Sequence, residues 1–209
     1  MTRLIDISPV VFAATPVWPG DVPFSMHKSV DIHAGGHLDL GAITTTLHIG
    51  AHADAHVHYD AAGSDAANMP LDAYYGPCQV VAVDARRGQR FGAEAIAGGL
   101  AGVRAPRVLL KTGTFPDPTH WNTDFAAPEP ALIDALADAG TVLVGFDTPS
   151  TDLFDSKDLP AHKRLAARDV CNLEGLVLRD VAPGDYTLIA LPLRIEGADA
   201  SPVRAVLVA

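Results

Sequence analysis

The stretch HIGAHADAHVHY, residues 48–59, gathers more side chains able to bind a metal or move a proton than any other part of the chain. Four of the nine histidines and one aspartate, Asp54, fall within its first eleven residues. Neutral imidazoles and a carboxylate suit zinc, manganese or iron, and a site with three protein ligands leaves a position for water. Such water can lose its proton near neutral pH and attack a carbonyl carbon. The stretch predicts the catalytic segment of a metal-dependent hydrolase; the opposing interpretation is a histidine-rich surface loop.

The backbone conformation of this stretch decides which side chains converge. In a helix, His48, His52 and His56 would share one face, because residues four positions apart point the same way. The glycine at position 50 and the β-branched run before the stretch disfavour a helix. In extended backbone, alternate residues from His52 to His58 would point the same way. A loop leaving a strand can combine both arrangements and direct His48, His52 and Asp54 at one point, with His58 free for proton transfer.

The residues before this stretch predict a loop and a hairpin. Residues 28–49 form the expected hairpin, with Gly35-Gly36 at its turn and a second arm rich in β-branched residues. Residues 8–23 contain four prolines and cannot be helical. Trp18 lies in this loop, either as an anchor in the core or as an aromatic wall of a pocket.

The residues after this stretch alternate between strand and helix patterns. Buried strands are expected at 79–85, 107–113 and 141–147, and helices at 92–102, 128–139 and 160–168. A short turn is expected to hold Glu174, and residues 186–209 predict two further strands. This alternation predicts an α/β fold with a mixed, partly parallel central sheet flanked by helices.

Composition narrows the class of protein. The 209 residues, of which 48% are hydrophobic, suit a single domain spanning 1–209. A net charge of −10 with only 15 Lys and Arg makes nucleic acid an unexpected partner. No apolar stretch is long enough to span a bilayer, so no membrane partner is expected, and residues 1–10 do not have a signal-peptide pattern. Cys78 and Cys171 are far apart in the sequence and belong to no CxxC pair, which predicts two free thiols in a reducing, cytoplasmic location; the alternative is a single disulfide between them.

Other hydrolytic and nucleotide-binding motifs are missing from the sequence. It contains no GxSxG elbow and no HGGG-type oxyanion segment, which argues against a serine hydrolase. It also contains no GxGxxG and no GxxxxGK[ST], so neither a dinucleotide nor an ATP phosphate site is predicted.

The histidine stretch resembles the HxGTHxDAPxHF signature of the cyclase family of metal-dependent hydrolases. The similarity extends over essentially the whole chain and is strongest to the bacterial kynurenine formamidases within that family. The segments that carry it are DISP (6–9), ATPVWPGD (14–21), PLDAYYGPC (70–78), DTPSTD (147–152), LEGLVL (173–178), PGDYTLIALPL (183–193) and DASPVRAVL (199–207). The resemblance implies a swivelling β/β/α fold and a homodimer.

The resemblance also implies roles for individual residues. Divalent metal, expected to be zinc, would be bound as two ions: the first by His48, His52 and Asp54, the second by Asp54 as a bridge together with His162 and Glu174. His58 would donate and accept protons, and Trp18 would contact the substrate. The chain departs from the signature at Ala51, in place of threonine, and at His56, in place of proline. We expect His56 to face solvent rather than metal.

The resulting hypothesis is an arylformamidase that hydrolyses N-formyl-L-kynurenine to L-kynurenine and formate in tryptophan degradation. Metal-activated water would be the nucleophile, and the substrate would be a small aryl formamide. One alternative is another hydrolase of the family, such as an isatin hydrolase that opens a cyclic amide. A second is a metal- or small-ligand-binding protein without turnover.

Overall fold

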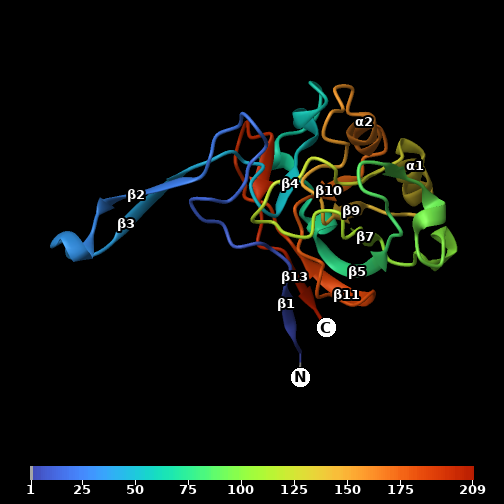
Figure 1. The fold of residues 1–209 in the computed structure, drawn as a ribbon, viewed down its shortest axis with the longest axis horizontal. Helices are drawn as coiled ribbons and strands as arrows, with labels where there is room; N and C mark the ends of the chain where they lie inside the picture. Colours follow the sequence, from blue (N-terminus) through green and yellow to red (C-terminus); the bar gives the residue numbers. More distant parts are fainter. Residues whose placement is uncertain (1) are drawn as a thin grey trace.

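A seven-stranded mixed sheet forms the centre of the computed structural model, which describes residues 2–209 (Figure 1). Its strand order is β1-β13-β11-β5-β7-β9-β10. The four strands from β5 to β10 run parallel, whereas β11, β13 and β1 are each antiparallel to their neighbours. These strands are β1 (Leu4–Asp6), β5 (Tyr75–Ala82), β7 (Arg107–Lys111), β9 (Leu143–Phe146), β10 (Cys171–Leu173), β11 (Gly184–Ile189) and β13 (Val206–Val208). The expected α/β class with a mixed sheet is confirmed.

Three small two-stranded sheets and several short helices surround this sheet. The small sheets pair β2 (Ser25–Val30) with β3 (Leu40–Thr44), β4 (His52–Asp54) with β12 (Ala200–Pro202), and β6 (Arg90–Phe91) with β8 (Ala127–Pro128). The α-helices are α1 (Pro130–Asp138) and α2 (Pro160–Ala167). The 3₁₀ turns are η1 (Ile32–Ala34), η2 (His56–His58), η3 (Ala66–Asn68), η4 (Leu71–Tyr74), η5 (Ala93–Ala95) and η6 (Leu100–Gly102). Within residues 2–209, no helix has the length and apolarity that a membrane span requires.

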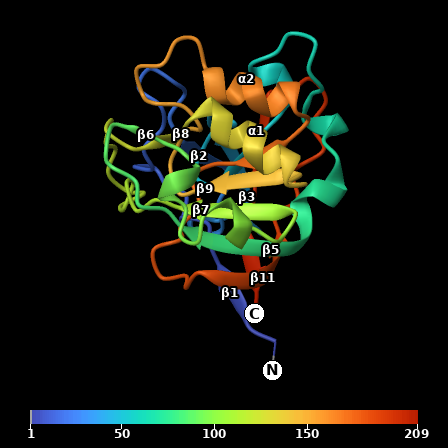
Figure 2. The same ribbon diagram turned by 90° about the vertical axis from the view of Figure 1, so that its right-hand side faces the viewer.

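Both faces of the central sheet are covered by other parts of the chain. Successive side chains of a strand point to opposite faces, so one strand contributes to a buried cluster on each side. On β7, Val108 and Leu110 pack in the cluster formed with α1 and α2, whereas Leu109 packs in the cluster on the opposite face. Helices α1 and α2 lie beside each other at the β9 side of the sheet (Figure 2). The strands therefore read as continuous apolar runs, and each fully buried leucine contributes about 1.5–3 kcal/mol.

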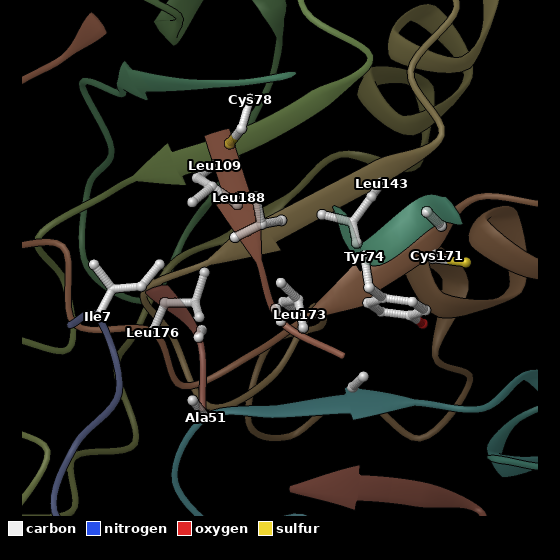
Figure 3. Close-up of a cluster of buried hydrophobic side chains, with 14 of the residues drawn as sticks. Ile7, Ala51, Tyr74, Cys78, Leu109, Leu143, Cys171, Leu173, Leu176 and Leu188 are labelled. Carbon is white, nitrogen blue, oxygen red and sulfur yellow. The ribbon is translucent and has the colours of Figure 1, made fainter. Parts of the chain in front are cut away.

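The buried cluster that contains Leu109, on the face away from α1 and α2, connects the sheet to the histidine stretch. Figure 3 shows Leu109, Leu143 and Leu188 of the sheet on the same side as Tyr74 and Ala51. The alanines at positions 51, 53 and 55 all belong to this cluster. In extended backbone, the residues between them must point away from the core. The sequence AHADA thus directs His52 and Asp54 to the opposite side of β4.

The β2–β3 hairpin extends away from the rest of the molecule as an arm (Figure 1). Most of its residues are exposed, including Met26 (65%), Leu40 (52%) and Ile43 (62%). The expected hairpin is confirmed, although its second strand ends at Thr44, and residues 45–51 reach β4 as a loop. Among the helices and strands of residues 2–209, none outside the hairpin packs extensively on the arm.

Several expected elements differ from the structure. Residues 92–102 form the 3₁₀ turns η5 and η6 and no α-helix, because Gly98 and Gly99 adopt φ of +81° and +64°. Glu174 follows β10, a strand and not a turn. The C-terminal part contains three strands instead of two, since β12 pairs with β4. The strands at 79–85, 107–113 and 141–147 and the helices at 128–139 and 160–168 are confirmed with shifted ends.

Candidate metal centre and cavity

Strand β4 brings the histidine stretch against the segment that follows β10. The backbone N–H of His52 donates to the carbonyl oxygen of Glu174 over 3.1 Å, and the N–H of Glu174 donates to the carbonyl of His52 over 2.9 Å. The two segments approach so closely that a Cβ at position 175 would lie 2.1 Å from the carbonyl oxygen of Gly50. Gly175, at φ +65°, is therefore required for Glu174 to reach the histidines.

A first group of possible metal ligands consists of His48, His52 and Asp54. His48 Nδ1 lies 3.0 Å and His52 Nε2 lies 3.5 Å from Asp54 Oδ1. The other nitrogen of His52, Nδ1, lies 3.0 Å from the carbonyl oxygen of Gly50, which directs Nε2 at the carboxylate. His52 Nε2 and Asp54 Oδ1 are both buried and have no hydrogen bond of good geometry, although His48 Nδ1 lies within 3.0 Å of that oxygen. A cation between these atoms would satisfy both, so the residues fit a bound metal ion.

A second group consists of Asp54, His162 and Glu174, all of them buried. His162 Nε2 lies 3.7 Å from Asp54 Oδ2 and 3.2 Å from Glu174 Oε1. Asp54 therefore belongs to both groups, with one oxygen directed at each. Helix α2 supplies His162 on its buried face, and the end of β10 supplies Glu174. The structure thus brings together five residues separated by up to 126 positions in the sequence, from His48 to Glu174.

Neutral donors hold the two carboxylates in place. Asn172 Nδ2 donates to Asp54 Oδ2 over 2.7 Å and to Glu174 Oε1 over 3.2 Å. The Thr151 backbone N–H and hydroxyl donate to Glu174 Oε1 over 2.7 and 2.6 Å. These donors fix the orientation of the carboxylates, as residues around metal ligands commonly do.

The charges in the cluster depend on one another. Burial acts to lower the pKa of His48, but Asp54 and Asp199 outweigh it and raise that pKa to about 9. Burial likewise opposes the charged form of His162, yet Asp152 and Glu174 raise its pKa to about 10. Burial acts to raise the pKa of Asp54, but the imidazoles, His48 first, hold it far below the ordinary value. Protons on the imidazoles balance the carboxylates, and a divalent cation could replace those protons.

His58 lies beside the first group, on the 3₁₀ turn η2. Its ring centroid is 4.2 Å from that of His48, and its Nδ1 is 3.5 Å from Asp199 Oδ2. Burial lowers the pKa of His58, which favours the neutral ring. His48, His58 and Asp199 form a third group whose atoms could hold an ion.

His56 leaves the cluster because the strand ends at Asp54 and the backbone enters η2. Its side chain is half-buried, and its Nε2 lies 3.3 Å from the carbonyl oxygen of Val170. Its ring thus contacts backbone; the expectation that it faces solvent is correct only in part. His56 is absent from the three groups found among residues 2–209.

A cavity of about 730 Å³ opens beside the cluster, and His48, His52, His58, His162 and Glu174 line it. Trp18 lines the same cavity, so the pocket-wall interpretation is the one that the structure supports. Its ring lies 5.1 Å from Phe154 and 5.4 Å from Trp121, measured between centroids. Phe115 adds another aromatic wall. The cavity is therefore lined both by the charged residues of the cluster and by a group of aromatic rings.

Sequence reasoning missed several residues of this site. Asp199, Asn172, Thr151 and Asp152 contact the cluster histidines or carboxylates, and Trp121 is a cavity wall. Asp199 and the pair Thr151-Asp152 fall in segments that carry the family resemblance, but no local pattern assigned them a role. Asn172 gave no signal in the sequence.

Comparisons with known proteins place the chain in a family and show which solved structures share its fold. The chain matches the model of the cyclase family, described as "Putative cyclase", over residues 5–153. A "predicted metal-dependent hydrolase" from Bacillus stearothermophilus is 25% identical, with a TM-score of 0.82, covering 100% of this chain and 98% of that one. Isatin hydrolase A from Labrenzia aggregata is 24% identical, with a TM-score of 0.84 and coverages of 99% and 93%. A potential metal-dependent hydrolase with cyclase activity is 24% identical, with a TM-score of 0.83 and coverages of 100% and 98%.

Proposed function

The chain belongs to the cyclase family and has the fold of its metal-dependent hydrolases, and from this premise we propose that it is an arylformamidase. The reaction is hydrolysis of N-formyl-L-kynurenine to L-kynurenine and formate, in tryptophan degradation. The observation that carries the proposal is a pair of buried atoms without well-formed hydrogen bonds, His52 Nε2 and Asp54 Oδ1, beside a cavity that His52 lines together with aromatic side chains.

The residues of the first and second groups would hold two divalent ions, which we propose to be zinc, with Asp54 shared between them. Bound there, the metal would polarise the formyl carbonyl and make water acidic enough to react near neutral pH. The neutral donors Asn172 and Thr151 keep the carboxylates aimed at the site. His52, Asp54, His162 and Glu174 are buried, and His52, His162 and Glu174 line the cavity, so we propose that the substrate reaches them from it.

His58 is the proton carrier in this proposal. As water adds to the formyl carbon, His58 accepts a proton from it, and as the carbon–nitrogen bond breaks, His58 returns that proton to the departing aryl amine. The side chain is 32% exposed and lines the cavity, so it can reach a bound substrate. The reaction therefore consumes one water molecule and releases one aryl amine and one formate.

Trp18 and its aromatic neighbours are proposed to bind the aryl ring of the substrate. Trp18 contacts Phe154 and Trp121 at centroid distances typical of aromatic pairs. A flat ring between such walls buries large apolar areas, and the formyl group would then face the metal groups. An aniline is also a better leaving group than an alkyl amine.

Hydrolysis of a cyclic aryl amide such as isatin is the second candidate. It is favoured by the likeness to three isatin hydrolase structures, at 19–24% identity. The same cavity and metal groups would serve both reactions, because each attacks a carbonyl attached to an aryl nitrogen. The third candidate is a protein that binds a metal or a small ligand and catalyses no reaction. In that case His58 would transfer no proton.

Formamidase activity that depends on a divalent metal is the expected result of the first experiment. Purified protein should contain between one and two equivalents of divalent metal and hydrolyse N-formyl-L-kynurenine. Dialysis against a chelator should remove nearly all activity, and zinc should restore it. A metal-free preparation with full activity would end the proposal, and a metal-loaded protein with no amide hydrolysis would favour the binding protein.

Two further substrates separate the candidates in the same assay. We expect kcat/KM for N-formyl-L-kynurenine to exceed that for isatin, and to exceed that for an alkyl formamide of equal length by at least about tenfold. Faster turnover of isatin would assign the second candidate. Equal rates on aryl and alkyl formamides would remove the role given to Trp18.

We also propose that a second copy of this chain packs on the β2–β3 arm, giving a homodimer. A two-stranded hairpin is at best marginally stable alone in water, and exposed apolar clusters mark interfaces. The arm exposes the large apolar side chains Met26, Ile32, Leu38, Leu40 and Ile43. Light scattering should give twice the mass of 21.9 kDa. Ile43→Asp, on the arm, should lower the measured mass to that of one chain. Val142→Asp, an exposed position outside the arm, should leave the mass unchanged. A natural protein with the mass of one chain would refute the dimer.

A cytoplasmic location is part of the same proposal. Cys78 and Cys171 are both buried and unpaired, as expected of a protein from a reducing compartment. Recovery of the activity in the periplasmic or secreted fraction of its source cells would contradict this location.

A further inference from the structure

Each imidazole of the first two groups has its second ring nitrogen held by an oxygen atom. His48 Nε2 faces Asp199 Oδ2 at 3.1 Å, and His52 Nδ1 faces the carbonyl of Gly50 at 3.0 Å. His162 Nδ1 faces Asp152 Oδ2 at 2.8 Å. In a ring that carries a single proton, an acceptor at one nitrogen holds the proton there and leaves the other nitrogen bare, which is the form that binds a metal.

Two of these three acceptors are side chains, Asp199 and Asp152, and Asp152 is the more firmly fixed of the two. It is fully buried, whereas the Asp199 side chain is 49% exposed. The backbone N–H groups of Ala161 and His162, at the start of α2, both donate to the Asp152 carboxylate. Arg90 Nη2 donates to its Oδ1 over 2.5 Å, and Arg90 Nη1 donates to the carbonyl of Pro128.

These contacts link the orientation of the carboxylate to the position of the helix that carries His162. The carboxylate cannot rotate without breaking bonds to α2 and to Arg90 at once. The same oxygen, Oδ2, accepts from the His162 backbone N–H and lies 2.8 Å from its ring Nδ1. Ring and backbone of His162 are therefore held to one oxygen, and Nε2 is left directed at Asp54 and Glu174.

We propose that Asp152 is a positioning residue that keeps the His162 proton on Nδ1, and so makes Nε2 the ligand of the second metal ion. The inference rests on the proposed function only in requiring metal at the group of Asp54, His162 and Glu174. The first group, with His48 and His52, has its own acceptors and does not depend on Asp152.

Asp152→Asn tests this inference with metal content as the measurement. Arg90 and the Ala161 N–H both donate to Oδ1, so the amide oxygen takes that place and the amide nitrogen takes the place of Oδ2. There it cannot accept from the His162 backbone N–H or from His162 Nδ1. It would donate to that nitrogen and transfer the ring proton to Nε2, where it blocks the metal. We expect bound zinc to fall from two ions to one, or the affinity for the second ion to fall by about 10- to 100-fold, in equilibrium dialysis.

Asp147→Asn is the matched control. Asp147 is another buried carboxylate five positions earlier, and it accepts from Thr112 and Gly113 without contacting the cluster. This variant should keep both ions. Two ions bound to Asp152→Asn with unchanged affinity would overturn the inference, and so would a natural protein that binds only one ion. A natural protein that binds no metal would instead refute the proposed function.

If Asp152→Asn does not fold and therefore binds no metal, the position of the His162 ring proton is measured in the natural protein instead. Zinc-loaded protein with ¹⁵N-labelled histidine reports the tautomer of each ring by nuclear magnetic resonance, and His162→Gln assigns the signal. A proton on His162 Nδ1 supports the inference. A proton on Nε2 overturns it.

Discussion

Replacing His58 with alanine is expected to lower kcat for an aryl formamide by about 10²- to 10⁴-fold, the usual contribution of a general acid–base group. The ring of His58 lies 4.2 Å from that of His48 and lines the cavity, so it is close to the first metal group and accessible to a substrate in the cavity. Burial keeps its pKa below the ordinary value, so the ring is neutral at pH 7 and able to accept a proton. KM should change little, because the ring acts on a proton in the transition state and not on the bound aryl group.

Metal content separates this role from the alternative one. Since His58 also belongs to a group with His48 and Asp199, it could bind an ion itself. If His58→Ala loses a metal ion together with its activity, the residue is a ligand and not a proton carrier. If kcat is unchanged, it is neither. His56→Ala is the matched control, since His56 lies on the same 3₁₀ turn but contacts the carbonyl of Val170, and its kcat should stay within a few-fold of the natural value.

The central strands and the two α-helices could be predicted from the sequence, because their signals are local. β7 and β9 are continuous apolar runs buried on both faces, and α1 begins with a proline in its first turn. The 92–102 segment was predicted wrongly because its alanines suit a helix, while Gly98 and Gly99 take left-handed conformations that end one. The pairing of β4 with β12 joins residues about 146 positions apart, such as Asp54 and Ala200, and no local pattern indicates it.

The candidate site divides in the same way. His48, His52 and Asp54 could be predicted from the residues alone, because one short stretch carries all three and the alanines between them alternate with the ligands. His162 and Glu174 were indicated only by the family resemblance. A single histidine on an amphipathic helix, or a glutamate after a strand, looks like many others until the fold places it beside Asp54.

The residues that orient the ligands could not be predicted by either route. Asn172 and Asp152 act through hydrogen bonds that exist only once β10, α2 and β4 have met. Their amino-acid types are common in loops and at helix starts, where they usually serve as caps. Asp152 accepts N–H groups at the start of α2 but lies eight residues before that helix, so no capping pattern in the sequence links it to His162.

Asp54→Asn is expected to remove both metal ions and to lower kcat/KM by at least about 10³-fold. Asp54 is the side chain common to the first and second groups, with Oδ1 near His48 and His52 and Oδ2 near His162. The substitution keeps the size of the side chain but removes the negative charge that would offset two divalent ions. Losing the metal's polarisation of the carbonyl costs several kcal/mol in the transition state, and each 1.36 kcal/mol is tenfold in rate.

A thermal measurement tests the same variant without any substrate. Zinc that binds only the folded protein should raise the Tm of the natural protein, whereas Asp54→Asn should show no such rise. Asp60→Asn is the matched control: Asp60 is an exposed carboxylate six positions later that accepts from the Ala62 N–H, and it should behave like the natural protein. If Asp54→Asn keeps both ions and their stabilisation, Asp54 does not bridge them, and the two groups must be held by separate residues.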